Sequence, residues 1–182
     1  MDTCASSYRR YLQGDEEAFD EIVKELFDKL VFFIDRYVHD TATAEDIAID
    51  AFTELVVHKH RYNFKVQLKT YLFMIGRSRA LNYLKHRKHL AETELEEADH
   101  ADDRQDLEAQ FVKTERHRLL HEALSRLPED MCTAVHLVYF EDMSYEETAR
   151  VMKKKKKQVD NLLYRAKTAL RTMLGKEGEL FV

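Results

Sequence analysis

The sequence predicts an all-α protein with two small helical domains joined by an acidic, flexible linker. Of the 182 residues, one is proline and four are glycine, so residues typical of turns are scarce. Apolar residues make up 45% of the chain, which is enough for a hydrophobic core. In most segments they recur at spacings of three and four, the pattern of an amphipathic helix. We expect a first domain at residues 1–88, the linker at 89–112 and a second domain at 113–182.

Three helices are predicted in the first domain. Residues 15–38 place apolar side chains on one face, from Phe19 to Val38. A second helix is expected to begin near Thr43, a candidate N-cap with Asp46 three residues later, and its outer side is acidic. Residues 58–67 lose the helical period and predict a loop. A third helix, rich in arginine and lysine, follows from about Tyr71.

The linker and the second domain differ sharply in composition. Residues 89–110 combine dense negative charge with little apolar periodicity, so they cannot bury enough surface to fold alone. Beyond them, Pro128 ends one helix and suits the first turn of the next. Ser144 and Glu147 have the spacing of a capping box at the start of a short helix. A longer helix then runs through Val159, Leu163 and beyond.

Five consecutive lysines separate these last two helices. A short capped helix, a turn and a longer helix have the layout of a helix-turn-helix, whose second helix lies in the DNA major groove. With Val159, Leu162, Leu163, Ala166 and Leu170 in the core, the other face can read bases and hold phosphates. A solvated lysine turn and a localisation tag are the alternatives. The predicted DNA-contacting residues on this helix are Lys156, Lys157, Gln158, Asn161, Tyr164 and Arg165.

The net charge of −5 hides two strongly basic segments. Residues 59–88 contain nine lysines and arginines and no acidic residue, and residues 151–176 contain nine against Asp160 alone. Between them, residues 89–112 carry nine carboxylates against Arg104. Two separated basic segments predict two places where phosphates are neutralised.

The first basic segment also contains aromatic residues. Among cations, such rings can stack unpaired bases, which favours single-stranded nucleic acid as a ligand. Core packing is the alternative for Tyr71 and Tyr83, so the loop aromatics Tyr62 and Phe64 are the stronger candidates.

Other classes of protein receive little support. His117 and His121 have a spacing that can hold zinc, but the HExxH base and a third ligand are missing, so we expect no metal or other cofactor. No nucleotide-binding or nucleophile motif is present, and we expect no enzymatic activity. Cys4 and Cys132 cannot form a disulfide framework, and no apolar run approaches a membrane span. We therefore expect a cytoplasmic protein without membrane insertion.

Taken in order, several segments resemble bacterial RNA polymerase sigma factors of the extracytoplasmic-function (ECF) branch. The first domain resembles the family's second conserved region through GDEEAFDEIVKEL, TAEDIAIDAFTEL and LKTYLFMIGRSRALNYLKHRKH. The second domain resembles its fourth conserved region through ALSRLPEDMCTAVHLVYFEDMSYEETARVM and QVDNLLYRAKTAL. The resemblance spans nearly the whole chain and is specific as an ordered set.

The resemblance implies a factor that binds core RNA polymerase and directs promoter recognition and DNA melting. The acidic helix would dock on the polymerase through Asp46, Asp50, Phe52 and Glu54. The last domain would bind the minus-thirty-five element as duplex, the linker would thread a basic channel of the polymerase, and an anti-sigma protein is a possible further partner. The loop and basic helix would melt the minus-ten element and capture its single strand through Arg61, Asn63, Phe64, Lys65, Lys69, Arg77, Arg79, Asn82 and Lys85.

Some positions depart from the family pattern. Lys153 and Lys155 occupy a turn that usually contains glycine and a small N-cap residue, so a lysine is expected to adopt a positive φ. Asp160 stands where a basic residue is common, and Ile49 replaces a polar residue on the polymerase-binding helix. A transcriptional regulator that binds DNA without polymerase is the competing hypothesis, although a ligand-sensing bundle has no reason to contain the basic and aromatic segment.

Overall fold

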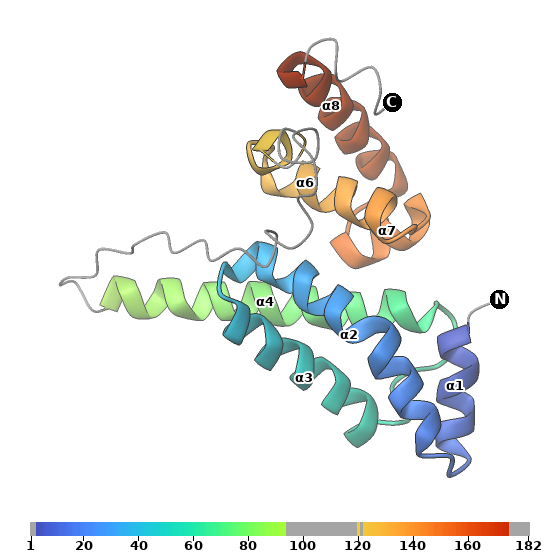
Figure 1. Ribbon diagram of the computed structural model, residues 1–182. Coiled ribbons are helices and arrows are strands. Elements are labelled where there is room, and N and C mark those ends of the chain that lie inside the picture. The colour runs from blue at the N-terminus through green and yellow to red at the C-terminus, as the bar shows by residue number, and fades with distance from the viewer. Residues whose placement is uncertain (1–2, 94–119, 121, 175–182) are drawn as a thin grey trace. The chain divides into compact units, whose positions relative to one another are not determined.

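The computed structural model describes residues 3–93, 120 and 122–174, with side chains from 3 to 90 in the first stretch. The chain divides into two units, Met1–Arg104 and Gln105–Val182, and the division falls within the range 89–112 predicted as the linker. The described parts of both units are helical and contain no strand (Figure 1). The predicted all-α class with two helical domains is therefore confirmed.

Four helices form the first unit: α1 (Thr3–Leu12), α2 (Glu17–Val38), α3 (Thr41–Val57) and α4 (Leu68–Thr93). Helix α2 packs against the other three, and α3 also packs against α4. The apolar faces predicted for α2, α3 and α4 meet in the core, where Leu30, Ile34, Phe33, Leu55 and Phe73 are fully buried. Helix α4 is longer than predicted and extends to Thr93, five residues into the range 89–112.

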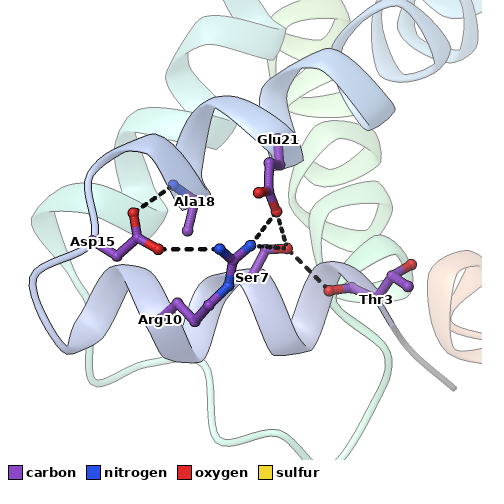
Figure 2. Close-up of polar contacts among 6 residues, drawn as sticks. All are labelled: Thr3, Ser7, Arg10, Asp15, Ala18 and Glu21. Carbon is purple, nitrogen blue, oxygen red and sulfur yellow. Dashed lines mark hydrogen bonds and ion pairs between the residues drawn. The ribbon is translucent and has the colours of Figure 1, made fainter.

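The sequence interpretation missed helix α1. Its segment, TCASSYRRYL, buries only Ser7 and Tyr8, so it has no stripe of aliphatic residues that could predict a helix. A network of polar contacts with the start of α2 holds it in place (Figure 2). Arg10 bonds Asp15 and Glu21, and Ser7 Oγ donates to Glu21 Oε2 at 2.7 Å.

The start of α3 corrects the predicted N-cap. Asp40, and not Thr43, is the capping residue, and its carboxylate accepts a hydrogen bond from the Thr43 N–H at 2.9 Å. Both hydrogen bonds from Thr43 lower the pKa of the Asp40 carboxyl, the side-chain bond more than the backbone bond. His39, in the left-handed region at φ 53°, links α2 directly to this cap. Thr43 therefore lies inside the first turn of α3.

A glycine in the middle of α4 permits the close approach of α2. A Cβ atom placed on Gly76 would lie 2.9 Å from Leu30 Cδ1 and 3.1 Å from Ile34 Cδ1. A larger residue would therefore require the Leu30 and Ile34 side chains to shift.

The second unit contains α6 (Glu129–Val135), α7 (Tyr145–Met152) and α8 (Lys156–Leu174), preceded by a helical turn at residues 122–125. Pro128 is the N-cap of α6, in keeping with its predicted place between two helices. Helices α6 and α7 both pack against α8.

Residues His136–Phe140 continue α6 as a π-helical turn, η2, which periodicity could not predict. The backbone N–H of Glu141 donates to the His136 carbonyl, five residues earlier, at 3.1 Å. This geometry brings two buried side chains together, with His136 Nε2 3.4 Å from Glu141 Oε1.

Among the described helices, none is both long and apolar enough to cross a membrane.

Candidate functional site

Helices α7 and α8 form the predicted helix-turn-helix. The capping box is confirmed: the Ser144 hydroxyl accepts from the Glu147 N–H, and the Glu147 carboxylate accepts from the Ser144 N–H. Lys153 ends α7 in the left-handed conformation, at φ 53° and ψ 42°, as expected from the missing glycine. The Lys154 N–H donates to the Ala149 carbonyl at 2.9 Å and closes the turn.

The outer face of α8 presents all six residues predicted to contact the minus-thirty-five element. Val159, Leu163 and Ala166 are buried, whereas Leu162 and Leu170 are only partly buried. The exposed residues are Lys156, Lys157, Gln158, Asn161, Tyr164 and Arg165. The predicted separation of a core face from an exposed face is confirmed for these residues, and DNA binding by the exposed face stays a prediction.

Some of these polar groups already have partners within the domain. The Gln158 Oε1 atom accepts from the Lys155 N–H at 2.7 Å, so this side chain helps to cap α8. Lys156 forms an ion pair with Glu146, which raises the pKa of the lysine and lowers that of the glutamate. Lys154 pairs with Asp130 at 3.0 Å. Among the described residues, the other four predicted positions have no such side-chain hydrogen bond or ion pair: Lys157, Asn161, Tyr164 and Arg165.

The predicted loop at residues 58–67 is confirmed between α3 and α4. Its aromatic residues behave differently from one another. Tyr62 is only 4% exposed and donates from its hydroxyl to the Val66 carbonyl at 2.8 Å, so the idea that it stacks bases was wrong. Phe64 is partly exposed and has a positive φ of 59°. Next to it, Asn63 Oδ1 accepts from the Lys65 N–H at 3.1 Å and stabilises the turn.

The residues of α4 that were predicted to bind DNA differ in whether their side chains already have partners within the domain. Arg77 bonds the Tyr37 hydroxyl at 3.2 Å, and Arg79 bonds Asp50 and Glu54 on α3. Asn82 and Lys85, farther along the helix, are exposed. Lys69 Nζ lies 5.8 Å from the centre of the Phe73 ring. Tyr83, expected in the core, is instead 37% exposed and lies beside Asn82 in sequence.

The acidic side of α3 is also divided. Asp46 and Asp50 are exposed, whereas the Glu54 side chain is only 18% exposed and accepts bonds from Arg61 and Arg79, each at 2.9 Å. Burial alone would raise the pKa of the Glu54 carboxyl, but the two arginines outweigh burial and lower that pKa. Phe52 is buried, and its ring is nearly perpendicular to that of Phe19, at an interplanar angle of 87°.

An apolar groove lies between α2 and α3, and sequence reasoning did not identify it. Its volume is about 260 Å³. Ile49, noted in the sequence as a departure from the family pattern, borders the groove and is 52% exposed. Apolar residues of both α2 and α3 line the groove, so the sequence could indicate it only if the packing of these two helices were already known. The lining residues are Phe19, Val23, Phe27, Ile49, Phe52, Thr53 and Val56.

Within the described residues, no cluster of three or more histidine, cysteine, aspartate or glutamate side chains could hold a metal ion. The pair His117 and His121 lies outside the residues that the structure describes.

Comparison with known families assigns both domains. Residues 22–89 match sigma-70 region 2, and residues 117–170 match sigma-70 region 4. The RNA polymerase sigma-H factor of Pseudomonas aeruginosa is 31% identical over 170 residues, which cover 88% of each chain. The ECF RNA polymerase sigma factor SigM of Bacillus subtilis is 24% identical, over 85% of this chain and 93% of that protein.

Solved structures agree on the fold. The sigma factor RpoE of Bartonella quintana, in complex with the anti-sigma factor NepR, is similar with a TM-score of 0.66 and 20% identity, covering 87% of this chain and 97% of that one. CnrH in complex with the cytosolic domain of CnrY gives a TM-score of 0.61 and 18% identity, covering 94% of each chain.

These matches exclude the two alternatives from the sequence, an enzyme and a regulator that acts without polymerase. The chain belongs to the extracytoplasmic-function branch of the sigma-70 family, whose members are not enzymes and direct RNA polymerase to promoters for transcription initiation.

Proposed function

We propose that this sigma factor divides its work among three surfaces. The exposed acids of α3 and the adjoining apolar groove dock on core RNA polymerase. The loop at 58–67 and the basic side of α4 hold the melted minus-ten strand. The outer face of α8 reads the minus-thirty-five element as duplex DNA. We place these events in the cytoplasm.

The exposed face of α8 is the observation that carries this proposal. Arg165 and Asn161 lie one turn apart, and both are exposed on the side opposite the buried Val159 and Leu163. Arginine bonds guanine and asparagine bonds adenine through pairs of donors and acceptors in the major groove. Lysines at the start of the helix would hold the flanking phosphates and fix its register.

The docking surface is supported by the combination of charge and apolar area on α3. Asp46 and Asp50 stand one turn apart on α3 and are exposed, and Ile49 of the same helix lines the groove. An apolar centre with a charged rim is the usual anatomy of a protein interface. The charges would steer the encounter with a basic surface of the polymerase, and the groove would supply buried area.

An anti-sigma protein is a second proposed partner. RpoE was solved in complex with the anti-sigma factor NepR, and CnrH was solved in complex with the cytosolic domain of CnrY. A helical inhibitor that covered either domain of this chain would block one of the three surfaces.

Two reciprocal substitutions test the division of work. Arg165→Ala should reduce run-off transcription from a cognate promoter about tenfold or more, because one good base contact contributes about 1–3 kcal/mol. Its affinity for core polymerase should stay unchanged in a fluorescence-anisotropy titration. Asp50→Arg should lower the affinity for core polymerase and leave the promoter-reading face of α8 unchanged. Since Asp50 also bonds Arg79, Asp46→Arg serves as a second variant on the same face. Loss of polymerase affinity in Arg165→Ala, or unchanged affinity in both aspartate variants, would refute the assignment.

A further inference from the structure

Helix α1 contacts the loop that lies between α3 and α4, although the match to sigma-70 region 2 begins only at residue 22. Tyr8 is fully buried, and its hydroxyl donates to the Leu55 carbonyl at 2.8 Å, near the end of α3. The same hydroxyl lies 3.5 Å from the Lys59 carbonyl, in the loop itself. Burial raises the pKa of Tyr8 to about 12, so the phenol remains a donor. One side chain of α1 thus fixes the backbone where the loop begins.

The aromatic ring of Phe64 is in contact with the same helix. The Arg9 guanidinium lies 4.8 Å from the centre of the Phe64 ring, a cation–π distance. The Tyr8 and Phe64 ring centres are 6.1 Å apart. The Tyr62 ring centre lies 4.7 Å from that of Phe64, 5.6 Å from that of Tyr8 and 5.1 Å from that of Tyr71 on α4. Phe64 needs this support because its φ of 59° is unfavourable for a residue with a bulky side chain.

Helix α1 is itself anchored to α2, which allows it to act as a fixed support. Figure 2 shows the Arg10 guanidinium between the carboxylates of Asp15 and Glu21, with Ser7 also directed at Glu21. Asp15 Oδ1 in turn accepts from the Ala18 N–H at 3.3 Å, in the first turn of α2. The hydrogen bonds from Arg10 and Ser7 lower the pKa of the Glu21 carboxyl, which stays charged at neutral pH.

We propose that α1 is a positioning element of the minus-ten site, in which Tyr8 sets the loop backbone and Arg9 braces the Phe64 ring for capture of an unpaired base. The inference rests on the proposed function of the loop at 58–67. A loop held in its binding conformation loses less entropy when the DNA strand arrives, so it binds more tightly. Neither residue needs to touch DNA for this effect.

The test measures base capture by the holoenzyme. Transcription of genomic DNA fragments first identifies a promoter that the holoenzyme uses. The non-template strand of its minus-ten element is then labelled with 2-aminopurine, a base analogue whose fluorescence rises when it leaves the base stack. Tyr8→Phe removes only the hydroxyl, and Arg9→Gln removes only the cation over the ring. Each should lower the equilibrium constant for base capture, obtained from the fluorescence change, about five- to tenfold, the range expected when one or two side chains lose their fixed conformation. Arg9→Lys keeps a cation and should restore most of the signal.

Three controls separate positioning from other roles. Lys24→Gln, at an exposed lysine of α2, removes the same charge from the same domain and should behave as wild type. The melting temperature and the affinity for core polymerase should change little in Tyr8→Phe and Arg9→Gln. The salt dependence of promoter binding should also keep its slope in Arg9→Gln, because a lost phosphate contact would reduce that slope by about one.

Distinct results would overturn the inference. Wild-type fluorescence in both variants would show that the loop needs no support from α1. A parallel loss of thermal stability and polymerase affinity would show a general structural role, and a changed salt slope would make Arg9 a phosphate contact. If the wild-type holoenzyme itself gave no signal at a promoter that it transcribes, the proposed role of the loop would fail, and this inference would fail with it.

Discussion

Arg79 of α4 and Glu54 of α3 form an ion pair, with Arg79 Nη2 2.9 Å from Glu54 Oε2. The resemblance to sigma factors assigned one of these residues to DNA and the other to polymerase. In the structure each neutralises the other, and the Glu54 side chain is largely buried. The pair therefore fixes α3, the proposed docking helix, to α4, the proposed DNA-binding helix. Asp46 and Asp50 remain exposed on α3, although Asp50 also bonds Arg79.

Glu54 should make the first domain sensitive to acid. Arg61 and Arg79 lower the pKa of this carboxyl below its ordinary 4.5. The resulting stability is fully present above pH 4.5 and is lost as the pH falls through the pKa of the folded state. Glu54→Gln should lower the free energy of unfolding by about 2 kcal/mol at pH 7 and remove this part of the acid dependence. Urea unfolding between pH 7 and pH 3 measures both effects, with exposed Glu16→Gln as the control. Equal stability of Glu54→Gln and wild type at pH 7 would contradict the structural role.

The apolar groove should contribute to polymerase affinity independently of the acidic residues. Ile49→Asp places a charge at the edge of the groove, and we expect a loss of affinity of about tenfold or more, as for a residue at the centre of an interface. Val57→Asp is the matched control, because Val57 is an equally apolar, exposed residue of α3 that does not line the groove. Both variants should retain the wild-type melting temperature within a few degrees. Equal affinity of the two variants for core polymerase would exclude the groove from the interface.

The lysine turn of the helix-turn-helix should store backbone strain. Lys153 has a φ of 53°, which disfavours any residue with a Cβ atom by about 1–2 kcal/mol relative to glycine. Lys153→Gly should therefore stabilise the second domain by about 1 kcal/mol, after the greater chain entropy of glycine is subtracted. Lys153→Ala removes the same charge but keeps the strain, so it should give no such gain. Thermal unfolding followed by circular dichroism distinguishes the two, and a gain in both variants would point to charge repulsion instead.

The helices with strong apolar periodicity were predictable from the sequence, and those held by polar or aromatic contacts were not. The core faces of α2 and α8, the loop at 58–67 and the capping box of α7 follow local rules that act within a few residues. Helix α1 depends on Tyr8 and on ion pairs from Arg10, which are made between residues that only the fold brings together. The π-helical turn at His136 likewise has no signal in the apolar periodicity of its segment.

The candidate site shows the same division. The exposed face of α8 could be read from the sequence because a helix with a known core face has a known outer face. Tyr62 was expected to be exposed and is buried, whereas Tyr83 was expected in the core and is exposed. Burial of a ring depends on neighbours that lie far away in sequence, such as Tyr8 in the case of Tyr62. The groove beside Ile49 was also missed, because it needs two helices to form its walls.

Reconstituted transcription tests the central claim most directly. Core RNA polymerase is incubated with fragmented genomic DNA, with and without the purified chain, and the RNA products are sequenced. With the wild-type protein we expect new transcripts that begin downstream of a shared pair of sequence elements. These transcripts should be lost when either Arg165→Ala or Asp50→Arg replaces the wild-type protein. A different sigma factor serves as the control that the core polymerase is active. If that control succeeds, identical transcripts with and without the purified chain would contradict the account.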